Sequence, residues 1–263
     1  MNAAVAAPVD AKADDFGDRW IVVSGASSGI GRGIAIELVR RGARVVLVGR
    51  RQANLEETAR LAGDPSKCEV CVLDLTRHDD IGPAITALAG RLGRLYGLVH
   101  CAGIVQTLPL ASSKPDRLRA MFDLNFVAGI ELARAFARRD VLDEAGGSLL
   151  WIASVYAHVG APGQIGYCAS KGAIVAAARA MALELAPRKL RVNCLSPGMV
   201  RTEMTDAGNS RMSAEQWQKI VAMHPLGTGE PGDVARAAAF MLDPRNTWIT
   251  GADLVIDGGY TLH

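Results

Sequence analysis

Residues 20–31 read Trp20-Ile21-Val22-Val23-Ser24-Gly25-Ala26-Ser27-Ser28-Gly29-Ile30-Gly31, an apolar run that passes through glycines into a helical pattern. The run Trp20–Ser24 has the length and composition of a buried strand. Glycines permit a tight turn and a close approach of the backbone to a ligand. The helix that follows offers free N–H groups and a partial positive charge to a pyrophosphate. This strand–turn–helix context predicts a dinucleotide-binding loop.

The same alternation of short apolar runs and helical patterns continues almost to the end of the chain. Seven buried strands are predicted at Trp20–Ser24, Arg44–Val48, Glu69–Leu73, Gly97–His100, Ser148–Ala153, Arg191–Leu195 and Leu254–Ile256. Helices are predicted at Ile30–Arg41, Ala53–Leu61, Asp80–Leu92, Arg117–Arg139, Ile165–Ala186 and Asp233–Leu242. Continuous apolar strands are expected where helices cover both faces of a sheet. The pattern predicts an α/β Rossmann fold with a mostly parallel, doubly wound sheet.

The bulk composition fits one globular α/β domain. The chain has 263 residues, of which 49% are hydrophobic and 21% charged, and its net charge of +2 is spread along the sequence. We expect no nucleic-acid or membrane partner. Residues 1–17 are rich in alanine and lack the pattern of a signal peptide, so we expect a disordered leader, a domain at 18–263 and a cytoplasmic protein.

The five cysteines do not suggest a disulfide framework. Cys68 and Cys71 form a C-x-x-C pair that could bind zinc or act in redox chemistry. However, residues three apart in a strand point to opposite faces, and no second Cys or His pair completes a site. We therefore expect a structural role and no metal.

A long segment, about residues 202–229, interrupts the alternation after the sixth strand. It mixes Met204, Met212, Trp217 and Met223 with polar residues. One interpretation is an irregular connection with a short surface helix. We favour a lid over a substrate, because long insertions at the carboxyl ends of strands tend to carry function.

The residues after the second strand indicate which dinucleotide is bound. An acidic residue there would accept from a ribose 2′-hydroxyl and repel a 2′-phosphate, but this chain has Arg50 and Arg51 instead. A guanidinium suits a phosphate, which favours NADP(H) over NAD(H), although two solvated arginines opening a helix are the alternative. After the third strand, Asp74 is suited to accept from an adenine amino group, or equally to cap the next turn.

Tyr167 and Lys171 lie four residues apart, on one face of a predicted helix. A phenol is a weak acid at neutral pH, and an adjacent ammonium favours its ionised form. Ser154 ends the fifth strand, in reach of the same crevice. The three residues together predict acid–base chemistry on an oxygen.

With these motifs the sequence resembles the short-chain dehydrogenase/reductase family over residues 19–261. The matching features are Gly25-x-x-x-Gly29-x-Gly31, Asp74, Ala102-Gly103, Asn125, Ser154, Tyr167-x-x-x-Lys171, Pro197-Gly198 and the tail from Ile249 to Tyr260. The tail looks most like the branch that contains 3-oxoacyl thioester reductases.

The resemblance implies roles for individual residues. Tyr167 would be the general acid in reduction, Ser154 would stabilise the reacting oxygen, and Lys171 would hold the nicotinamide ribose and lower the Tyr167 pKa. Asn125 would bend its helix and support a water that relays protons. The implied cofactor-binding residues are Gly25, Ser27, Ser28, Gly29, Ile30, Gly31, Arg50, Arg51, Asp74, Leu75, Cys101, Ala102, Gly103, Asn125, Tyr167, Lys171, Pro197, Gly198, Val200 and Thr202.

The chain departs from the family at the end of the fourth strand. The family commonly has Asn-Asn-Ala-Gly there, whereas this chain has His100-Cys101-Ala102-Gly103. His100 and Cys101 could be a nucleophilic pair, but we favour a buried strand end beneath the cofactor. Ser24 replaces the usual Thr and keeps its hydroxyl.

We therefore expect an NADP(H)-dependent enzyme that interconverts a ketone and a secondary alcohol. Alternatives are a sugar or polyol dehydrogenase of the same family, or a catalytically silent NADP-binding sensor. The apolar lid favours alkyl or ring ketones. The acidic turn Asp143–Gly147 would repel an acyl carrier protein, so we expect free or coenzyme-A-linked 3-oxoacyl groups. The family pattern predicts a homotetramer, or a homodimer, through helices 117–139 and 165–186, with small residues at Ala133, Ala135, Ala137, Ala173, Ala176, Ala177 and Ala180.

Overall fold

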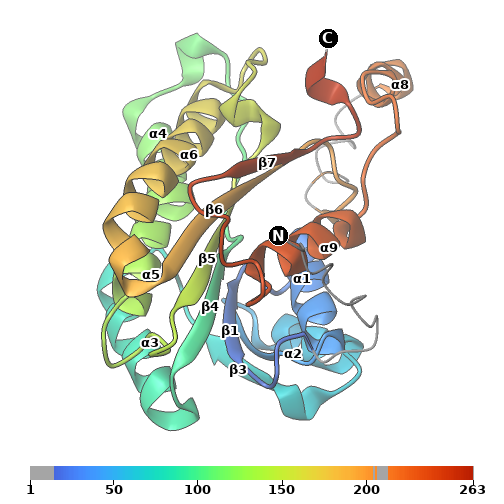
Figure 1. Cartoon of the computed structure of the whole chain (residues 1–263). Coiled ribbons are helices and arrows are strands. Elements are labelled where there is room, and N and C mark those ends of the chain that lie inside the picture. Colours follow the sequence, from blue (N-terminus) through green and yellow to red (C-terminus); the bar gives the residue numbers. More distant parts are fainter. Residues whose placement is uncertain (1–14, 204, 206–212, 263) are drawn as a thin grey trace, which may run out of the picture.

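Seven parallel strands form one sheet in the order β3-β2-β1-β4-β5-β6-β7 (Figure 1). The computed structural model describes residues 15–203, 205 and 213–262. The strands are β1 (Trp20–Ser24), β2 (Arg44–Gly49), β3 (Cys68–Val72), β4 (Leu95–His100), β5 (Gly147–Ile152), β6 (Leu190–Pro197) and β7 (Asp253–Ile256). The predicted strands are all present, each within two residues at either end, and the doubly wound fold is confirmed.

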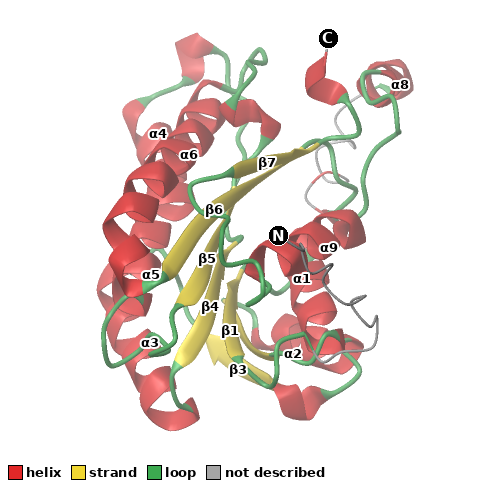
Figure 2. Cartoon of the chain, in the orientation of Figure 1, coloured by secondary structure: helices red, strands yellow, loops and turns green. Residues whose placement is uncertain are grey.

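Helices cover both faces of the sheet (Figure 2). They are α1 (Gly29–Arg40), α2 (Gln52–Leu61), α3 (His78–Leu92), α4 (Pro115–Phe122), α5 (Ala128–Phe136), α6 (Ile165–Leu185), α8 (Ala214–Ala222) and α9 (Pro231–Leu242). One apolar cluster lies between the sheet and α3, α5 and α6. The other lies between the sheet and α1, α2 and α9. The central strands are therefore buried on both sides, as their continuous apolar sequences predict.

The edge strand β7 differs from the expectation of a buried strand. Leu254 is 40% exposed and Val255 is 38% exposed. The strand pairs only with β6 among the described residues. An edge strand leaves part of its surface uncovered, and sequence patterning alone does not distinguish it from a central one.

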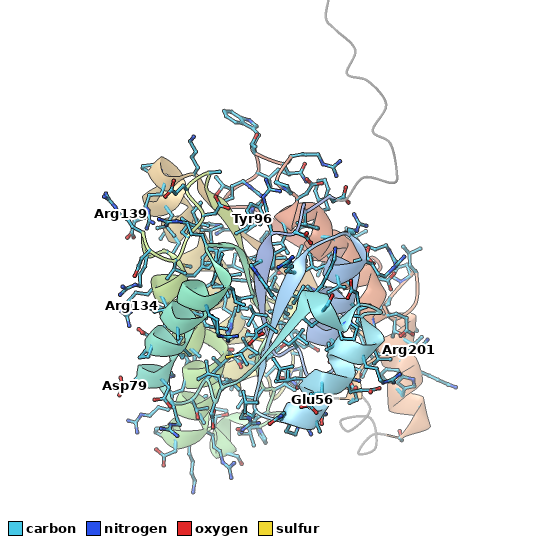
Figure 3. The ribbon with its side chains drawn as sticks, turned by 90° about the horizontal axis from the view of Figure 1, so that it is seen from below. Glu56, Asp79, Tyr96, Arg134, Arg139 and Arg201 are labelled. Atoms are coloured by element: carbon cyan, nitrogen blue, oxygen red, sulfur yellow. The ribbon has the colours of Figure 1, made fainter. Side chains whose placement is uncertain are left out.

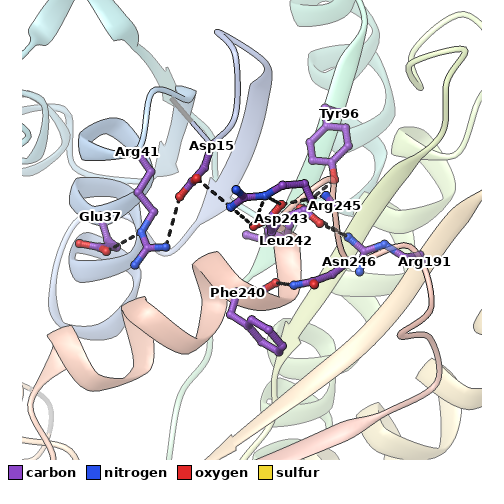
Figure 4. A network of polar contacts seen from close by, with 10 residues as sticks. All are labelled: Asp15, Glu37, Arg41, Tyr96, Arg191, Phe240, Leu242, Asp243, Arg245 and Asn246. Carbon is purple, nitrogen blue, oxygen red and sulfur yellow. Dashed lines mark hydrogen bonds and ion pairs between the residues drawn. The ribbon is translucent and has the colours of Figure 1, made fainter. Parts of the chain in front are cut away.

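The ordered fold begins earlier than expected. Phe16 is fully buried, and its backbone N–H donates to the carbonyl of Arg41. Asp15 forms ion pairs with Arg41 and Arg245 (Figure 4). The expected disordered leader at 1–17 is therefore wrong for residues 15–17, and residues 1–14 lie outside the described part of the chain.

A buried arginine holds the end of α9 in the same region. The Arg191 guanidinium donates to the carbonyl oxygens of Leu242 and Asp243 (Figure 4). It also donates to the carbonyl oxygen of Met241. The last carbonyls of a helix have no partner within the helix, so a buried cation there satisfies them. Tyr96 adds a hydrogen bond from its hydroxyl to the carbonyl of Leu242.

The predicted helix at 117–139 is interrupted. A π-helix, Asp123–Val127, lies between α4 and α5 and carries Asn125 in its middle. Such one-turn insertions are rare and occur mostly at functional sites. The bend expected of Asn125 from the family resemblance therefore takes the form of a widened helical turn.

Charged side chains are spread over the surface rather than gathered. Seen from below, Arg134 and Arg139 point outward from the α5 side and Arg201 lies on the opposite side (Figure 3). No described helix is both long and apolar enough to cross a membrane. Within the described residues, no three His, Cys, Asp or Glu side chains are grouped so as to hold a metal ion.

The C-x-x-C pair is separated by the sheet, as predicted. Cys68 packs against one apolar cluster and Cys71 against the other. Burial raises the pKa of the Cys68 thiol to about 11 and also raises that of Cys71. Both thiols are therefore protonated at neutral pH, which is unsuitable for metal binding or redox exchange.

Candidate active site

Most of the predicted site residues follow the carboxyl ends of parallel strands and so lie at one edge of the sheet, while Asn125 lies in the π-helix and Tyr167 and Lys171 lie in α6. The glycine turn after β1 is built without room for side chains. An ideal Cβ on Gly25 would lie 2.8 Å from the backbone nitrogen of Ala102, and one on Gly31 would lie 2.3 Å from the carbonyl oxygen of Gly25. Gly25 and Gly29 have φ of +71° and +51°, which favour glycine. The turn therefore fits the close backbone approach that a dinucleotide requires.

The N-terminus of α1 holds an anionic group from the chain itself. The backbone N–H of Gly29 donates to Oε2 of Glu203 over 3.1 Å. The Ser28 side chain makes no capping hydrogen bond, and no acidic residue lies in the first turn of α1. The carboxylate thus lies where a phosphate is expected, which shows that this helix end accepts an anion.

The remaining residues of the loop have structural contacts as well. The carbonyl oxygen of Ser27 accepts a hydrogen bond from Arg32 over 2.6 Å. Ile30 packs against the apolar cluster on the α1 side. A dinucleotide at this turn would therefore meet backbone groups and the start of α1, rather than the Ile30 side chain.

Arg50 and Asp74 meet where β2 and β3 end. Both Arg50 and Arg51 are exposed, and Arg51 immediately precedes α2. The Asp74 carboxylate accepts hydrogen bonds from the Thr76 N–H and hydroxyl, which lower its pKa, and the positive charge of Arg50 lowers it further. Asp74 thus caps its turn, one of its two predicted roles. Leu75 is buried in the apolar core.

Ser154, Tyr156 and Tyr167 lie together on one face of the candidate site. The 3₁₀ turn Val155–Ala157 begins at Ser154, whose hydroxyl oxygen accepts from the N–H of Tyr156 over 3.2 Å. The rings of Tyr156 and Tyr167 meet edge to face, with centroids 6.1 Å apart. Ser154 is also hydrogen-bonded to the Tyr167 side chain, an interaction that lowers the Tyr167 pKa. The predicted Ser–Tyr pair is therefore in contact.

Lys171 lies beneath this face, but it does not ionise the phenol. Its ammonium nitrogen is 5.7 Å from the Tyr167 ring centroid and donates to the carbonyl oxygen of Ile152 over 2.7 Å. Burial raises the Tyr167 pKa to about 12 and lowers the Lys171 pKa to about 8. Burial outweighs the lowering by Ser154, and Lys171 is not among the groups that shift the Tyr167 pKa, so the expected effect of Lys171 on that pKa stays a prediction.

Asn125 links the loop after β4 to α6. Its Oδ1 accepts from the Ile104 N–H over 2.8 Å, and its Nδ2 donates to the Ile104 carbonyl and the Ser170 hydroxyl. An ideal Cβ on Gly103 would lie 3.0 Å from Asn125 Oδ1 and 3.8 Å from Lys171 Nζ. The structure therefore brings Asn125, Gly103 and Lys171 together at one point.

His100 and Cys101 do not form a nucleophilic pair. Both ring nitrogens of His100 lie within hydrogen-bonding distance of other groups, Ser24 and the Asn125 carbonyl. Burial raises the pKa of the Cys101 thiol to about 12. A protonated thiol without a base is inert, which argues against the nucleophilic pair.

The segment after β6 returns to the phosphate loop. Val200 is buried, and an ideal Cβ on Gly198, just after Pro197, would lie 2.9 Å from Asp257. Thr202 lies against Gly29, whose ideal Cβ would be 3.1 Å from Thr202 Cγ2. These contacts bring the predicted nicotinamide side of the site next to the pyrophosphate side.

The lid segment is partly described. Helix α8 lies near the C-terminal turn (Figure 1), where His224 stacks on Tyr260 with ring centroids 4.7 Å apart. Trp217 is half-buried and Met223 is 41% exposed. Met204 and Met212 lie outside the residues that the structure describes. The segment thus includes a helix, which both interpretations of the sequence allow.

The acidic turn lies on the far side of the molecule. Asp143–Gly147 precedes β5, and an ideal Cβ on Gly146 would lie 2.4 Å from the carbonyl oxygen of Lys189, which precedes β6. Both segments are at the amino ends of parallel strands, opposite the site. Glu144 is also paired with Arg94. The position of this turn gives no support to the expected repulsion of a carrier protein, which stays a prediction.

Sequence reasoning missed Glu203, Ser170 and Ile104. Ser170 lies between Tyr167 and Lys171 in the motif, so its place beside the site could have been inferred from helical periodicity. Glu203 is 174 positions from Gly29. No local pattern indicates that contact.

Comparisons with known proteins agree with this architecture. Residues 25–261 match the family described as enoyl-(acyl carrier protein) reductase. The chain is 32% identical over 248 residues to the 3-oxoacyl-[acyl-carrier-protein] reductase FabG of Chlamydia pneumoniae, across 92% of this chain and 97% of that protein. A short-chain type dehydrogenase/reductase from Mycobacterium marinum has a TM-score of 0.87 at 31% identity, over 95% of this chain and 98% of that one. ElxO with NADP bound shares the fold, with a TM-score of 0.84 at 24% identity over 94% of this chain and 100% of that one.

The fold and the site define an oxidoreductase that uses a nicotinamide dinucleotide and acts on CH–OH groups. The chain belongs to the short-chain dehydrogenase/reductase family, in the branch of the 3-oxoacyl reductases.

Proposed function

We propose that the protein is an NADP(H)-dependent reductase that converts a 3-oxoacyl thioester or a similar apolar ketone into a secondary alcohol. The observation that supports this most directly is the grouping of Ser154, Tyr167 and Lys171, with Ser154 close enough to Tyr167 to lower the pKa of its phenol and Lys171 Nζ 5.7 Å from its ring centroid. Hydroxyl donors directed at one point suit an oxygen that gains negative charge during reaction.

The residues have distinct tasks in this proposal. A bound dinucleotide would supply the hydride that reduces the carbonyl carbon. Tyr167, protonated because its pKa is about 12, gives its proton to the carbonyl oxygen, and Ser154 donates a hydrogen bond to the same oxygen. Lys171 holds the ribose and replaces the proton on Tyr167, a task for which a pKa of about 8 is well matched. In oxidation the same steps run in reverse.

NADP(H) is favoured over NAD(H) by the charge near the ribose. Arg50 lies close enough to Asp74 to lower the pKa of that carboxyl, so a guanidinium is present at the ends of β2 and β3. An arginine binds a 2′-phosphate through charge-assisted hydrogen bonds. ElxO, a protein of the same fold, has been solved with NADP bound.

An apolar substrate is favoured by Tyr156, which lies against Tyr167, and by partly exposed apolar residues in the segments after β4 and β6. Tyr156 and Trp217 are half-buried, while Met223 and Val105 are 41% and 38% exposed. Aromatic and thioether side chains form an adaptable apolar surface, which suits an acyl chain better than a sugar. The relative from Chlamydia pneumoniae is named as a 3-oxoacyl reductase, which supports the same class.

The test is the oxidation of NADPH in the presence of one 3-oxoacyl group in three forms: a small thioester, a coenzyme A thioester and a carrier-protein thioester. Polyhydroxylated sugars serve as the comparison. We expect turnover of all three thioesters and none of the sugars. Preference for a sugar would overturn the substrate class, and dinucleotide binding without any turnover would indicate a sensor.

The roles are tested by a matched pair of variants. Tyr167→Phe should abolish turnover and leave dinucleotide affinity within about twofold, because only the phenol proton is lost. Tyr156→Phe also removes a hydroxyl beside the site, yet it should retain most of the turnover. Substantial turnover by Tyr167→Phe contradicts the assigned chemistry.

We further propose a homotetramer, or a homodimer, that pairs through α6. The small residues of α5 are used within the protomer, since Ala133 and Ala135 are buried in its own core. On α6, by contrast, Ala176 and Ala180 are exposed and Leu183 is 82% exposed. The exposed small and apolar residues of α6 support a close-packed neighbour at that helix.

A further inference from the structure

His100 connects the strand that leads into the phosphate loop with the π-helix that carries Asn125. It ends β4 and is 1% exposed. Its Nδ1 lies 3.0 Å from the hydroxyl oxygen of Ser24, the last residue of β1. Its Nε2 lies 3.2 Å from the backbone carbonyl oxygen of Asn125. One buried ring therefore contacts both halves of the site.

The hydrogen-bonding partners determine which ring nitrogen carries the proton. The Ser24 oxygen accepts from the N–H groups of Cys101 and Ala102, over 3.1 Å and 3.2 Å. Its only hydrogen is then left to donate to Nδ1 of His100. Nδ1 is therefore an acceptor, and the proton on Nε2 is donated to the Asn125 carbonyl. Burial, with a contribution from the Lys171 charge, lowers the His100 pKa to about 4, so the ring is neutral at neutral pH.

The ring is also held in orientation by its packing. His100 and Trp151 meet edge to face, with centroids 5.3 Å apart and planes at 80°. An ideal Cβ on Gly129 would lie 2.2 Å from Trp151 Cζ3 and 2.7 Å from His100 Cδ2. The two rings fill the space that this glycine leaves, so the His100 ring has no room to turn.

The Asn125 side chain is already occupied by Ile104 and Ser170, so the backbone carbonyl that His100 contacts is a separate point of support. We propose that His100 is a positioning residue: its neutral ring holds the Asn125 segment of the π-helix against β1, and so keeps Asn125 and Lys171 placed to return protons to Tyr167. This inference rests on the proposed function. His100 acts through Asn125 and touches neither substrate nor cofactor.

Two substitutions separate the two hydrogen bonds. In His100→Asn the amide oxygen can take the place of Nδ1, which keeps the Ser24 contact and loses the Asn125 contact. In His100→Gln the amide nitrogen can reach the place of Nε2, which keeps the donor to Asn125. We expect kcat to fall about tenfold in His100→Asn, in keeping with the loss of one hydrogen bond of the site, and to be largely restored in His100→Gln. The substrate KM and the dinucleotide Kd should stay within about twofold in both.

The chain offers a matched control. His78 Nε2 lies 3.1 Å from the carbonyl oxygen of Asp123, in the same π-helix, but His78 begins α3, a helix on the outer layer. His78→Asn removes a similar contact and should leave kcat unchanged. In His100→Asn we also expect the limb of the kcat–pH profile that reflects Lys171 to move to higher pH, because water admitted beside Lys171 stabilises its ammonium. An equal fall of kcat in His78→Asn and in His100→Asn would show that any lost contact to the π-helix slows turnover, and would overturn the proposal.

A measurement without turnover completes the test. Nitrogen-15 NMR of the imidazole rings, compared between wild type and His100→Asn, identifies the His100 signal as the one that is missing from the variant, and this signal should show a proton on Nε2 and none on Nδ1. A proton on Nδ1, or unchanged kcat in His100→Asn, would refute the positioning role. Retained turnover in Tyr167→Phe would instead refute the proposed function, and it would leave the NMR assignment intact.

Discussion

The Glu203 carboxylate and the Gly29 N–H are joined by a hydrogen bond of 3.1 Å at the first residue of α1. Arg32 faces the same carboxylate at 3.9 Å. A dinucleotide pyrophosphate would need this N–H and would be repelled by this charge. The start of the lid segment therefore competes with the cofactor for one end of one helix.

Glu203→Gln should tighten dinucleotide binding about fivefold, equivalent to about 1 kcal/mol for a solvent-exposed charge and its hydrogen bond. The amide keeps the size of the side chain and removes its charge. The measurement is a titration of dinucleotide by calorimetry, without substrate. Glu215→Gln, in α8, removes another exposed carboxylate and should change nothing. Adenosine, which lacks phosphates, should bind equally to wild type and Glu203→Gln. Weaker dinucleotide binding by Glu203→Gln would contradict a competition between this carboxylate and the pyrophosphate.

Arg50→Asp should reverse the preference between the two dinucleotides. The new carboxylate would repel a 2′-phosphate and accept from a free 2′-hydroxyl. A charge-assisted contact is worth roughly 1.5–3 kcal/mol, so we expect NADPH to bind at least about tenfold more weakly, with NADH unchanged or tighter. Affinities for both dinucleotides, measured on both proteins, decide the matter. A wild type that already prefers NADH rules out this role of Arg50.

Stability should fall in mild acid because of His100. Its pKa is about 4 in the folded protein, against 6.5 for an unperturbed histidine. Between these values the unfolded chain binds a proton that the folded protein does not, so the free energy of unfolding falls as pH drops from about 6.5 to about 4. The shift corresponds to about 3 kcal/mol over that range. Urea unfolding at several pH values should show a flatter dependence in His100→Gln than in wild type and in His78→Asn; identical slopes would contradict it.

Ala176→Arg should disrupt the proposed assembly. Ala176 is exposed on α6, where a close neighbour would leave no space for a long charged side chain. We expect a smaller sedimentation coefficient than for wild type at the same micromolar concentration. Ala87→Arg places the same side chain on an exposed site of α3 and should sediment as wild type does. A wild type that is monomeric under these conditions refutes the assembly itself.

Much of the fold could be predicted because buried parallel strands have continuous apolar sequences, as in Ile21–Val23 and Leu149–Ile152. The exposure of Leu254 and Val255 in the edge strand β7 could not be predicted, because these residues are as apolar as their counterparts in central strands. The π-helix at Asn125 also escaped prediction. It has no proline or glycine within it, and an extra residue in a helical turn leaves no mark on hydrophobic periodicity.

The candidate site could be predicted where one motif spans neighbouring residues, as Tyr167 and Lys171 do on α6. Contacts between segments that are distant in the sequence could not be predicted. The hydrogen bond from the Gly29 N–H to Glu203 is the clearest case. The raised pKa of Tyr167 could not be predicted for a different reason. Spacing indicates which charge is near, but the pKa depends on how much water burial removes, and that is known only from the folded structure.

Gly129 limits the order in which this sequence can change. Any other residue there would bring its Cβ to 2.2 Å from Trp151, a fully buried ring at the centre of the sheet. Alanine at 129 therefore becomes tolerable only after the residue at 151 has become smaller, and that change in turn removes the packing that fixes His100. A lineage that exchanges His100 for a smaller side chain is thus free to change positions 151 and 129 next, whereas the reverse order passes through a poorly packed core. The three positions should evolve as a set.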